Sequence, residues 1–162
     1  MKTFAPLLLA SLLIASPVAA QNAGQIAHAK AGASCAGCNL FQADFANTEL
    51  KGRNFARSRL RQADFSAAVM NHTSFAGADL RDVNAYAGVF SGADFAHADL
   101  THASFVGTYL QGANLAGAKL DGTNFSGAEM TRARGLTGRQ LAAACGDAST
   151  TLPLGLHLQA CR

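Results

Sequence analysis

A large apolar residue returns at every fifth position between residues 40 and 130, and this spacing limits the fold more than any other feature of the chain. The nineteen positions hold eight Leu, eight Phe, two Met and Ala85. On an α-helix this spacing rotates the apolar position by about 140° per copy, and on a strand an odd spacing moves it to the opposite face each time. Neither regular element can bury the pattern, so the sequence predicts a repeat architecture.

A second regularity indicates how each five-residue unit is built. The residue two positions before the central apolar one is small in seventeen of the nineteen units, and the exceptions are Arg53 and Val83. Side chains two apart lie on the same face of an extended segment, so each unit is expected to be a three-residue strand with two side chains pointing inward.

The remaining two residues of each unit must turn the chain. The second of them is often glycine, which accepts a positive φ at little cost. These glycines are Gly52, Gly77, Gly92, Gly107, Gly112, Gly117, Gly122 and Gly127. A chain that turns after every five residues winds into a solenoid.

The order of Phe and Leu along the repeat predicts the number of sides. The two residue types alternate over most of the run, and only an even number of sides stacks Phe on Phe and Leu on Leu in successive coils. Four turns of about 90° close a coil of twenty residues. Ala85 interrupts the column of Phe45, Phe65 and Phe105, and we expect Val83 to refill part of the gap; the alternative is a bulge that turns Tyr86 inward.

The recurring triplets Ala-Asp-Phe, Ala-Asp-Leu and Ala-Asn-Leu over residues 38–134 resemble the pentapeptide repeat family, whose consensus is A(D/N)LXX. The resemblance implies an all-β fold, a right-handed quadrilateral parallel β-helix of about five coils whose interior is filled by side chains. The best-known members of the family mimic DNA and inhibit gyrase, which requires a strongly negative tower. Residues 38–134 carry nine basic and nine acidic residues, so a DNA-mimic topoisomerase inhibitor is a disfavoured alternative.

Segments on both sides of the repeat have separate expected roles. Residues 1–20 have a basic start, a short apolar core and small residues before Gln21, and we expect them to be a signal peptide. The mature protein would then be an exported bacterial protein, periplasmic or secreted, without membrane insertion after cleavage. Residues 21–37 form an N-terminal cap segment. Residues 135–162 form a C-terminal helical cap and tail, with a capping-box pattern at Thr137 and Gln140 before Leu141 to Ala144.

Four cysteines in an exported chain favour disulfides over free thiols. Because the two pairs lie at opposite ends of the tower, the expected bonds are Cys35–Cys38 and Cys145–Cys161. A redox-active C-x-x-C pair at Cys35 and Cys38 is the alternative. A low thiol pKa needs a helix N-terminus after the first cysteine, whereas strand-like repeats follow here.

The sequence contains no pattern that points to catalysis. A Ser-His-Asp order, a P-loop and an H-E-x-x-H motif are all absent, so we expect no catalytic residue, no metal site and no cofactor. The aspartates before the central apolar residues occupy their consensus place, which favours turn hydrogen bonds. The leading hypothesis is a non-catalytic exported scaffold or protein-interaction module.

Two surface features remain as candidate binding sites. An apolar patch is expected where outward columns meet at one corner: Val69, Tyr86, Val89, Val106 and Tyr109. Such a patch suggests contact with another protein or with a second copy of the chain. A basic patch is expected around the first coils: Lys51, Arg53, Arg57, Arg59 and Arg61. The overall charge of +3 implies no partner by itself, and no nucleic-acid partner is expected.

Overall fold

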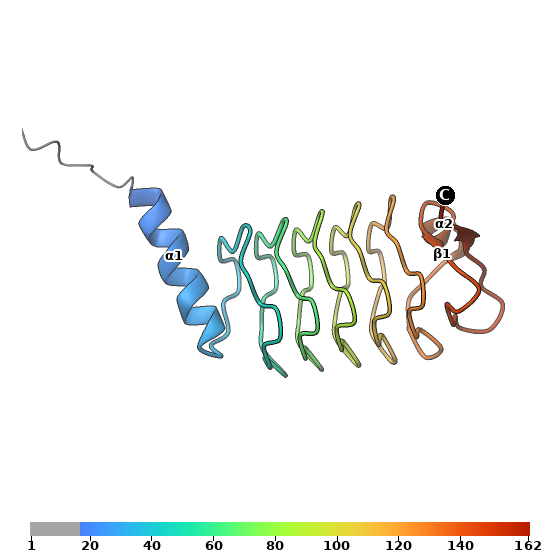
Figure 1. Ribbon diagram of the computed structural model, residues 1–162, viewed down its shortest axis with the longest axis horizontal. Helices are drawn as coiled ribbons and strands as arrows, with labels where there is room; N and C mark the ends of the chain where they lie inside the picture. The colour runs from blue at the N-terminus through green and yellow to red at the C-terminus, as the bar shows by residue number, and fades with distance from the viewer. Residues whose placement is uncertain (1–16) are drawn as a thin grey trace, which may run out of the picture.

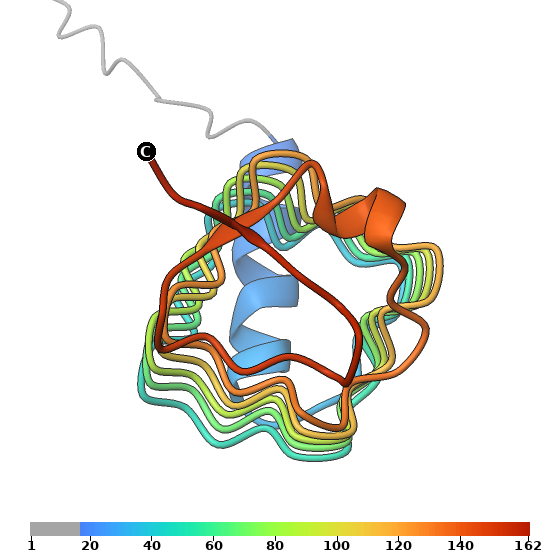
Figure 2. The same ribbon diagram turned by 90° about the vertical axis from the view of Figure 1, so that its right-hand side faces the viewer.

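The computed structural model describes residues 17–162 as a four-sided tower of stacked coils with a helix across one end (Figures 1 and 2). Most of the expected signal peptide lies outside the described residues, so its identity stays a prediction. Within residues 17–162, no helix combines the length and the hydropathy that a membrane crossing requires.

Parallel β-bridges connect each unit to the unit twenty residues later. They run from Asn39 with Arg59 to Asn114 with Arg134, and the bridging residue is the one before each central apolar residue. A bridge at every fifth residue and closure after twenty make four sides per coil, as expected from the Phe and Leu order. Each side of the tower therefore pairs with the next coil through a single bridging residue, and strands of two or more residues are few.

The turns between sides use a left-handed residue at the second position. The eight turn glycines expected from the sequence have φ between 65° and 68°. Other residues occupy the same position in ten further turns, including Ala67 with φ +53° and Ala87 with φ +54°. Aspartates stabilise the turns, because the Asp64 and Asp94 carboxylates each accept the N–H two residues further on.

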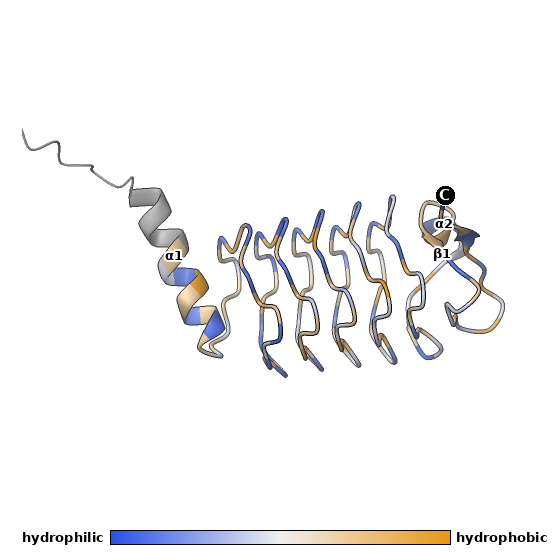
Figure 3. Cartoon of the chain, viewed as in Figure 1, coloured by the Kyte–Doolittle hydropathy of each residue, from blue (hydrophilic) through white to orange (hydrophobic). Residues whose placement is uncertain are grey.

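The interior of the tower is packed with buried side chains and rich in aromatic residues. Phe rings stack on Phe rings one coil away, with centroid separations of 5.3 Å for Phe45 and Phe65 and 5.2 Å for Phe75 and Phe95. Figure 3 shows that hydrophobic and hydrophilic residues alternate along the coils. Inward hydroxyls do not stay unpaired: the buried Thr73 donates to the carbonyl of Leu50 at 2.8 Å. The core is thus filled by side chains, and it encloses no channel.

The gap at Ala85 is filled by Phe90, which the sequence analysis did not foresee. The Phe90 ring lies 6.2 Å from that of Phe65 and 5.7 Å from that of Phe105, so it reaches between the two rings of the interrupted column. Gly88 makes this possible, because a Cβ there would lie 2.6 Å from the Phe90 ring. The backbone has no bulge at this point, since the bridge register continues through Asn84 and Val89.

Tyr86, next to the gap, does not turn inward. Its side chain is 58% exposed, whereas Val83 is buried at the inward position as expected. Thus the ring that replaces the missing Phe comes from the neighbouring side of the same coil.

The N-terminal end is covered by helix α1 (Pro17–Lys30), which crosses the open end of the first coil (Figure 2). Ala29 is fully buried and Ile26 packs against the core. The Gln25 side chain accepts the backbone N–H of Asn39 at 2.7 Å. The all-β expectation was wrong in this respect, because the cap segment is helical and its apolar residues close the stack.

The ladder begins at Cys35, three residues before the expected boundary. The Cys35 N–H donates to Asn54 O, and the Arg59 N–H donates to Cys38 O, each at 2.8 Å. Both cysteines therefore occupy inward positions of the repeat, twenty residues before Phe55 and Ser58. Their disulfide lies at the end of the interior column, beneath α1.

At the C-terminal end, helix α2 (Gly138–Leu141) takes the place of a regular side. Thr137 is its N-cap, and the Thr137 and Gln140 side chains form the expected capping box. The Gln140 amide also donates to the carbonyls of Leu115 and Ala118, each at 2.9 Å. These carbonyls belong to the preceding coil, so the Gln140 side chain ties the helix to that coil. The Leu115 carbonyl also accepts the Ala118 N–H at 3.1 Å.

After α2 the chain rejoins the ladder out of register. Cys145 pairs with Asn124, and Thr151 pairs with Glu129, so the spacing grows from twenty to twenty-one and then twenty-two residues. Helix α2 is shorter than expected from the sequence, because Ala144 packs in the core instead of continuing the helix.

The last residues close the tower with a small sheet and a disulfide. Strand β1 (Cys145–Gly146) pairs in parallel with strand β2 (Gln159–Ala160). The second disulfide joins Cys145 to Cys161, which is the pairing favoured from the sequence. Closing a loop of this length contributes about 3 kcal/mol in the chain-entropy description.

Candidate interaction surfaces

The candidate apolar residues lie together on one corner of the tower, which we call the apolar corner (Val69, Tyr86, Val89, Val106 and Tyr109). Val69, Val89 and Tyr109 are joined in one column by parallel bridges. Tyr86 and Val106 belong to adjacent coils of the neighbouring turn, because the Tyr86 and Val106 carbonyls accept N–H groups from successive coils. The two tyrosines are the most exposed of the five side chains, at 58% and 50%.

Small residues separate the two columns of the apolar corner. Ala67, Ala87 and Gly107 occupy the turn between them, so the turn itself carries no long side chain. At one end of the valine column stands Glu49 and at the other Glu129. The corner therefore presents one tyrosine ring on each side of a turn. A glutamate stands at each end of the column that contains Tyr109.

The five candidate basic residues do not share one face. Lys51 and Arg61 are engaged by carboxylates, with Glu49 at 2.6 Å and Asp82 at 3.0 Å. The other three, Arg53, Arg57 and Arg59, make no ion pair with any residue between 17 and 162. Because they occupy different sides and turns of the tower, a ligand would have to wrap around it to touch them all.

The Cys35–Cys38 disulfide lines a pocket of about 520 Å³ beneath α1. Gln25 and His28 of the helix face the same pocket. Cys35 is only 5% exposed, and α1 precedes the pair instead of beginning after it. This arrangement lacks the helix N-terminus that would lower a thiol pKa, so it favours a structural role for the bond.

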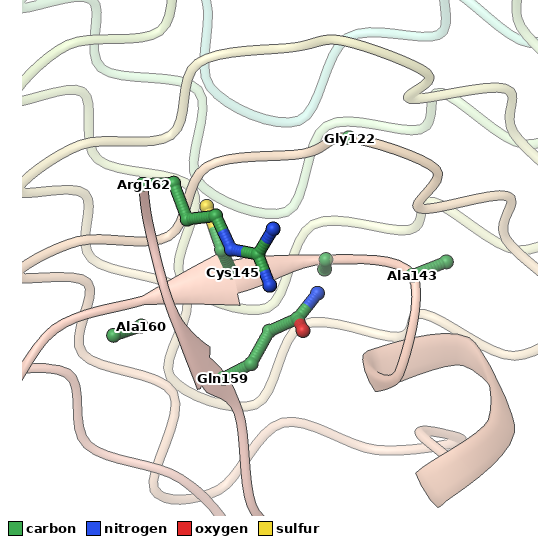
Figure 4. A pocket seen from close by; sticks show the side chains of 7 residues that line it. Gly122, Ala143, Cys145, Gln159, Ala160 and Arg162 are labelled. Carbon is green, nitrogen blue, oxygen red and sulfur yellow. The ribbon is translucent and has the colours of Figure 1, made fainter.

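Figure 4 shows a second pocket, of about 380 Å³, at the C-terminal end. The Arg162 guanidinium and the Gln159 carboxamide project over small residues: Gly122, Ala143, Ala144 and Cys145. The Gln159 amide also reaches the carbonyl of Ala142 at 3.4 Å. The pocket is open and shallow, and its polar groups come from the last residues of the chain.

Two of the turn histidines, His97 and His102, do not form a site. His97 and His102 are exposed turn residues with φ of +57° and +58°, and each leans over a glycine of the next coil, Gly117 or Gly122. No group of three His, Cys, Asp or Glu side chains among the described residues could hold a metal ion.

The acidic side chains of the repeat serve the fold. The Arg81 guanidinium, hydrogen-bonded to Asp79 at 2.6 Å, lowers the pKa of that carboxyl below its usual value. Such pairing is typical of a solvated face, and it gives no general acid or base.

A groove that the sequence analysis missed lies on another corner. It holds about 410 Å³ and is lined by His72, Ser91, Gly92, Gln111, Gly112, Arg132 and Arg134. Four of these residues stand twenty apart, as His72, Gly92, Gly112 and Arg132. Reading that column from the sequence would have located the groove, because two successive glycines leave an uncovered stretch between two basic residues.

Comparisons with known proteins agree with this architecture. The family model described as pentapeptide repeats matches residues 54–84, 89–127 and 108–134, with 8 copies. A pentapeptide repeat protein from the thylakoid lumen of Arabidopsis thaliana is 30% identical. This chain covers 74% of it, the match spans 69% of this chain, and the TM-score is 0.58. Comparison with curated proteins returns no match.

Two further solved structures match this chain at lower identity. HetL, a pentapeptide repeat protein involved in heterocyst differentiation regulation in Nostoc sp. strain PCC 7120, is 21% identical, with coverage of 79% of this chain and 65% of HetL and a TM-score of 0.36. QnrB1, a plasmid-mediated fluoroquinolone resistance protein, is 21% identical, with coverage of 76% of both chains and a TM-score of 0.42. The repeat model, the Arabidopsis relative and the twenty-residue ladder lead to one conclusion: this chain belongs to the pentapeptide repeat family.

Proposed function

We propose that this protein is an exported, non-catalytic interaction module whose apolar corner binds an apolar segment of another protein. The tower is a right-handed β-helix of about five coils with α2 as its C-terminal cap. The observation that carries the proposal is the pair of exposed tyrosines, Tyr86 and Tyr109, on a corner without charged side chains between them. Exposed aromatic side chains are enriched at protein contacts.

The size of the apolar corner favours a short segment as its occupant over a second copy of the chain. The five side chains span about three coils, roughly 10–15 Å along the tower. A stable dimer buries about 800 Å² per partner, which is far more than such a patch can supply.

Export is part of the same proposal. Disulfides at both ends of the tower are typical of an oxidising compartment, and the predicted cleavage site before Gln21 leaves Gln25, Ile26 and Ala29 of the cap in place. We therefore expect a periplasmic or secreted protein that begins at Gln21, which the intact mass of the recovered protein tests.

A photoreactive residue placed at Tyr109 in the living cell tests the docking surface. We expect it to crosslink to a distinct protein, and the double variant Tyr86→Ser and Tyr109→Ser to lose that partner in a pull-down while the protein stays monomeric by light scattering. Leu154→Ser is the matched control, because Leu154 is a fully exposed apolar residue in the C-terminal tail. Crosslinks only between copies of this chain, or equal recovery of the partner by the double variant, would overturn the proposal.

A further inference from the structure

The groove that contains Gly92 and Gly112, here the glycine groove (His72, Ser91, Gly92, Gln111, Gly112, Arg132 and Arg134), has the features of a binding site that the proposed function does not use. Its volume of about 410 Å³ lies within the range of small-molecule pockets. It lies at the turn that follows Tyr109 along the coil, and none of its lining residues belongs to the apolar corner.

The floor of the groove is bare backbone at Gly112 only. Gly92 and Gly112 both have φ of +68°, and they stand one coil apart. A Cβ at Gly92 would lie 2.6 Å from Nδ1 of His72, so the imidazole already covers that glycine. No atom lies within 4 Å of a Cβ at Gly112, so this part of the floor is open. A ligand can therefore approach the backbone of Gly112 directly.

The open floor also presents a free hydrogen-bond donor. In the same column, the His72 N–H donates to Ser91 O at 3.0 Å and the Gly92 N–H donates to Gln111 O at 2.8 Å. The Gly112 N–H has no acceptor within residues 17–162. A backbone N–H that a turn leaves unpaired is a donor suited to anions.

Two arginines at the groove are free of ion pairs. Arg132 and Arg134 have no carboxylate within ion-pair distance in residues 17–162, unlike Arg61, Arg81 and Lys119. Arg132 stands twenty residues after Gly112, at the same turn position of the next coil, so its side chain starts next to the open floor.

The acidic groups nearest the groove are already engaged. The Glu129 carboxylate accepts the side-chain amide of Gln111. The Asp94 carboxylate accepts the Asn114 amide at 2.9 Å and the Ala96 N–H at 3.1 Å. These neutral donors leave the carboxylate charges in place, but neither carboxylate lines the groove, whereas Arg132 and Arg134 do. The charged side chains that line the groove are therefore positive.

We propose that the glycine groove binds a tetrahedral oxyanion, a phosphate or sulfate group, whose oxygens take the Gly112 N–H and the guanidinium groups of Arg132 and Arg134. Arginine matches such groups because its planar fork donates two parallel hydrogen bonds. The Ser91 hydroxyl and the His72 imidazole line the rest of the groove and would face the carrier of the anion.

Amide NMR of the whole protein with both disulfides intact tests this site. Inorganic phosphate, sulfate and a sugar phosphate monoester are titrated at constant ionic strength. We expect a saturable shift of the Gly112 amide, and the double variant Arg132→Gln and Arg134→Gln weakens binding about tenfold or more. A monoester that binds more tightly than the free ions identifies a phosphorylated small molecule, whereas equal affinities identify the inorganic anion; both results support recognition of the group.

Gly112→Ala and Gly107→Ala form a matched pair of variants. Both positions have nearly the same positive φ and no atom within 4 Å of an added Cβ, so both substitutions impose the same backbone strain. Only the methyl at position 112 would cover the floor, so only Gly112→Ala should weaken binding. A Gly112 amide that does not shift, an unchanged affinity in the double arginine variant, or equal loss in the two alanine variants would overturn the proposal.

Discussion

Substitutions at positions 85 and 90 should show how strongly the packing of the two side chains is coupled. Ala85→Phe restores the regular Phe column, and Phe90→Leu restores the Leu and Met column on the next side. In the native protein the Phe90 ring occupies the space that a Phe at 85 would need, at 5.7 Å from the Phe105 ring. We therefore expect each single variant to be destabilised and the double variant to recover most of the loss.

The magnitudes follow from the contacts of Phe90. Ala85→Phe alone adds a ring to a filled space, and such overpacking costs about 1–3 kcal/mol. Phe90→Leu alone leaves a void beside Ala85 and Gly88 and removes four ring contacts, at 6.2, 6.1, 5.8 and 5.7 Å between centroids. Aromatic pairs contribute about 0.5–1.5 kcal/mol beyond burial. At the lower end of that range the four contacts amount to about 2 kcal/mol, and with the void the loss is about 2–3 kcal/mol.

Equilibrium unfolding in urea measures the three free energies and the coupling between the two substitutions. The double variant should lie within about 1 kcal/mol of the native protein, which is a coupling of about 3 kcal/mol. Ala85→Phe combined with Phe45→Leu is the control, because the Phe65 coil separates these positions and their costs should add within about 0.5 kcal/mol. If the costs at 85 and 90 also add, the ring at 90 does not fill the gap at 85.

Two further changes test the turns and the C-terminal cap. Ala67→Gly should raise the melting temperature by about 1–4 °C in a thermal scan, because glycine relieves a left-handed alanine at φ +53°, and a lower value contradicts that reasoning. Hydrogen bonds from the Ser149 hydroxyl and the Gly127 N–H lower the pKa of Asp147 from 3.8 to about 2. The stabilisation is present above pH 4 and is lost as the pH falls through 2, so the stability difference between native protein and Asp147→Asn should shrink over that interval.

The regular part of the tower was predictable because each rule acts within one unit or between units twenty residues apart. The small residue two positions before the centre, the turn glycine and the alternation of Phe with Leu predict inward positions, corners and the number of sides. The filling of the gap at Ala85 was not predictable in the same way. It depends on Gly88 allowing a ring from another side to cross the interior, which is a three-body packing effect.

The structures of the two ends and of the glycine groove could not be predicted from the repeat pattern, because they depend on contacts outside it. Helix α1 packs through isolated residues such as Ile26 and Ala29, whose role is defined only by the coil below them. The apolar corner followed from the twenty-residue columns and lies where the sequence placed it. The glycine groove needed one more fact, the unpaired N–H of Gly112, which the repeat pattern does not reveal because the bridges on both sides of it, at Tyr109 and Asn114, are regular.

The growing spacing of the last bridges, where Cys145 joins Asn124 and Thr151 joins Glu129, determines how long this molecule can be. A solenoid of identical coils has no intrinsic length, because each coil contacts only its neighbours. The register shifts by one residue at Cys145 and by two at Thr151, so the last coil does not offer a regular ladder edge to a further coil. Strand β2 and the Cys145–Cys161 bond hold the last coil in this shifted register. The number of coils is thus limited by a register shift that the disulfide holds in place.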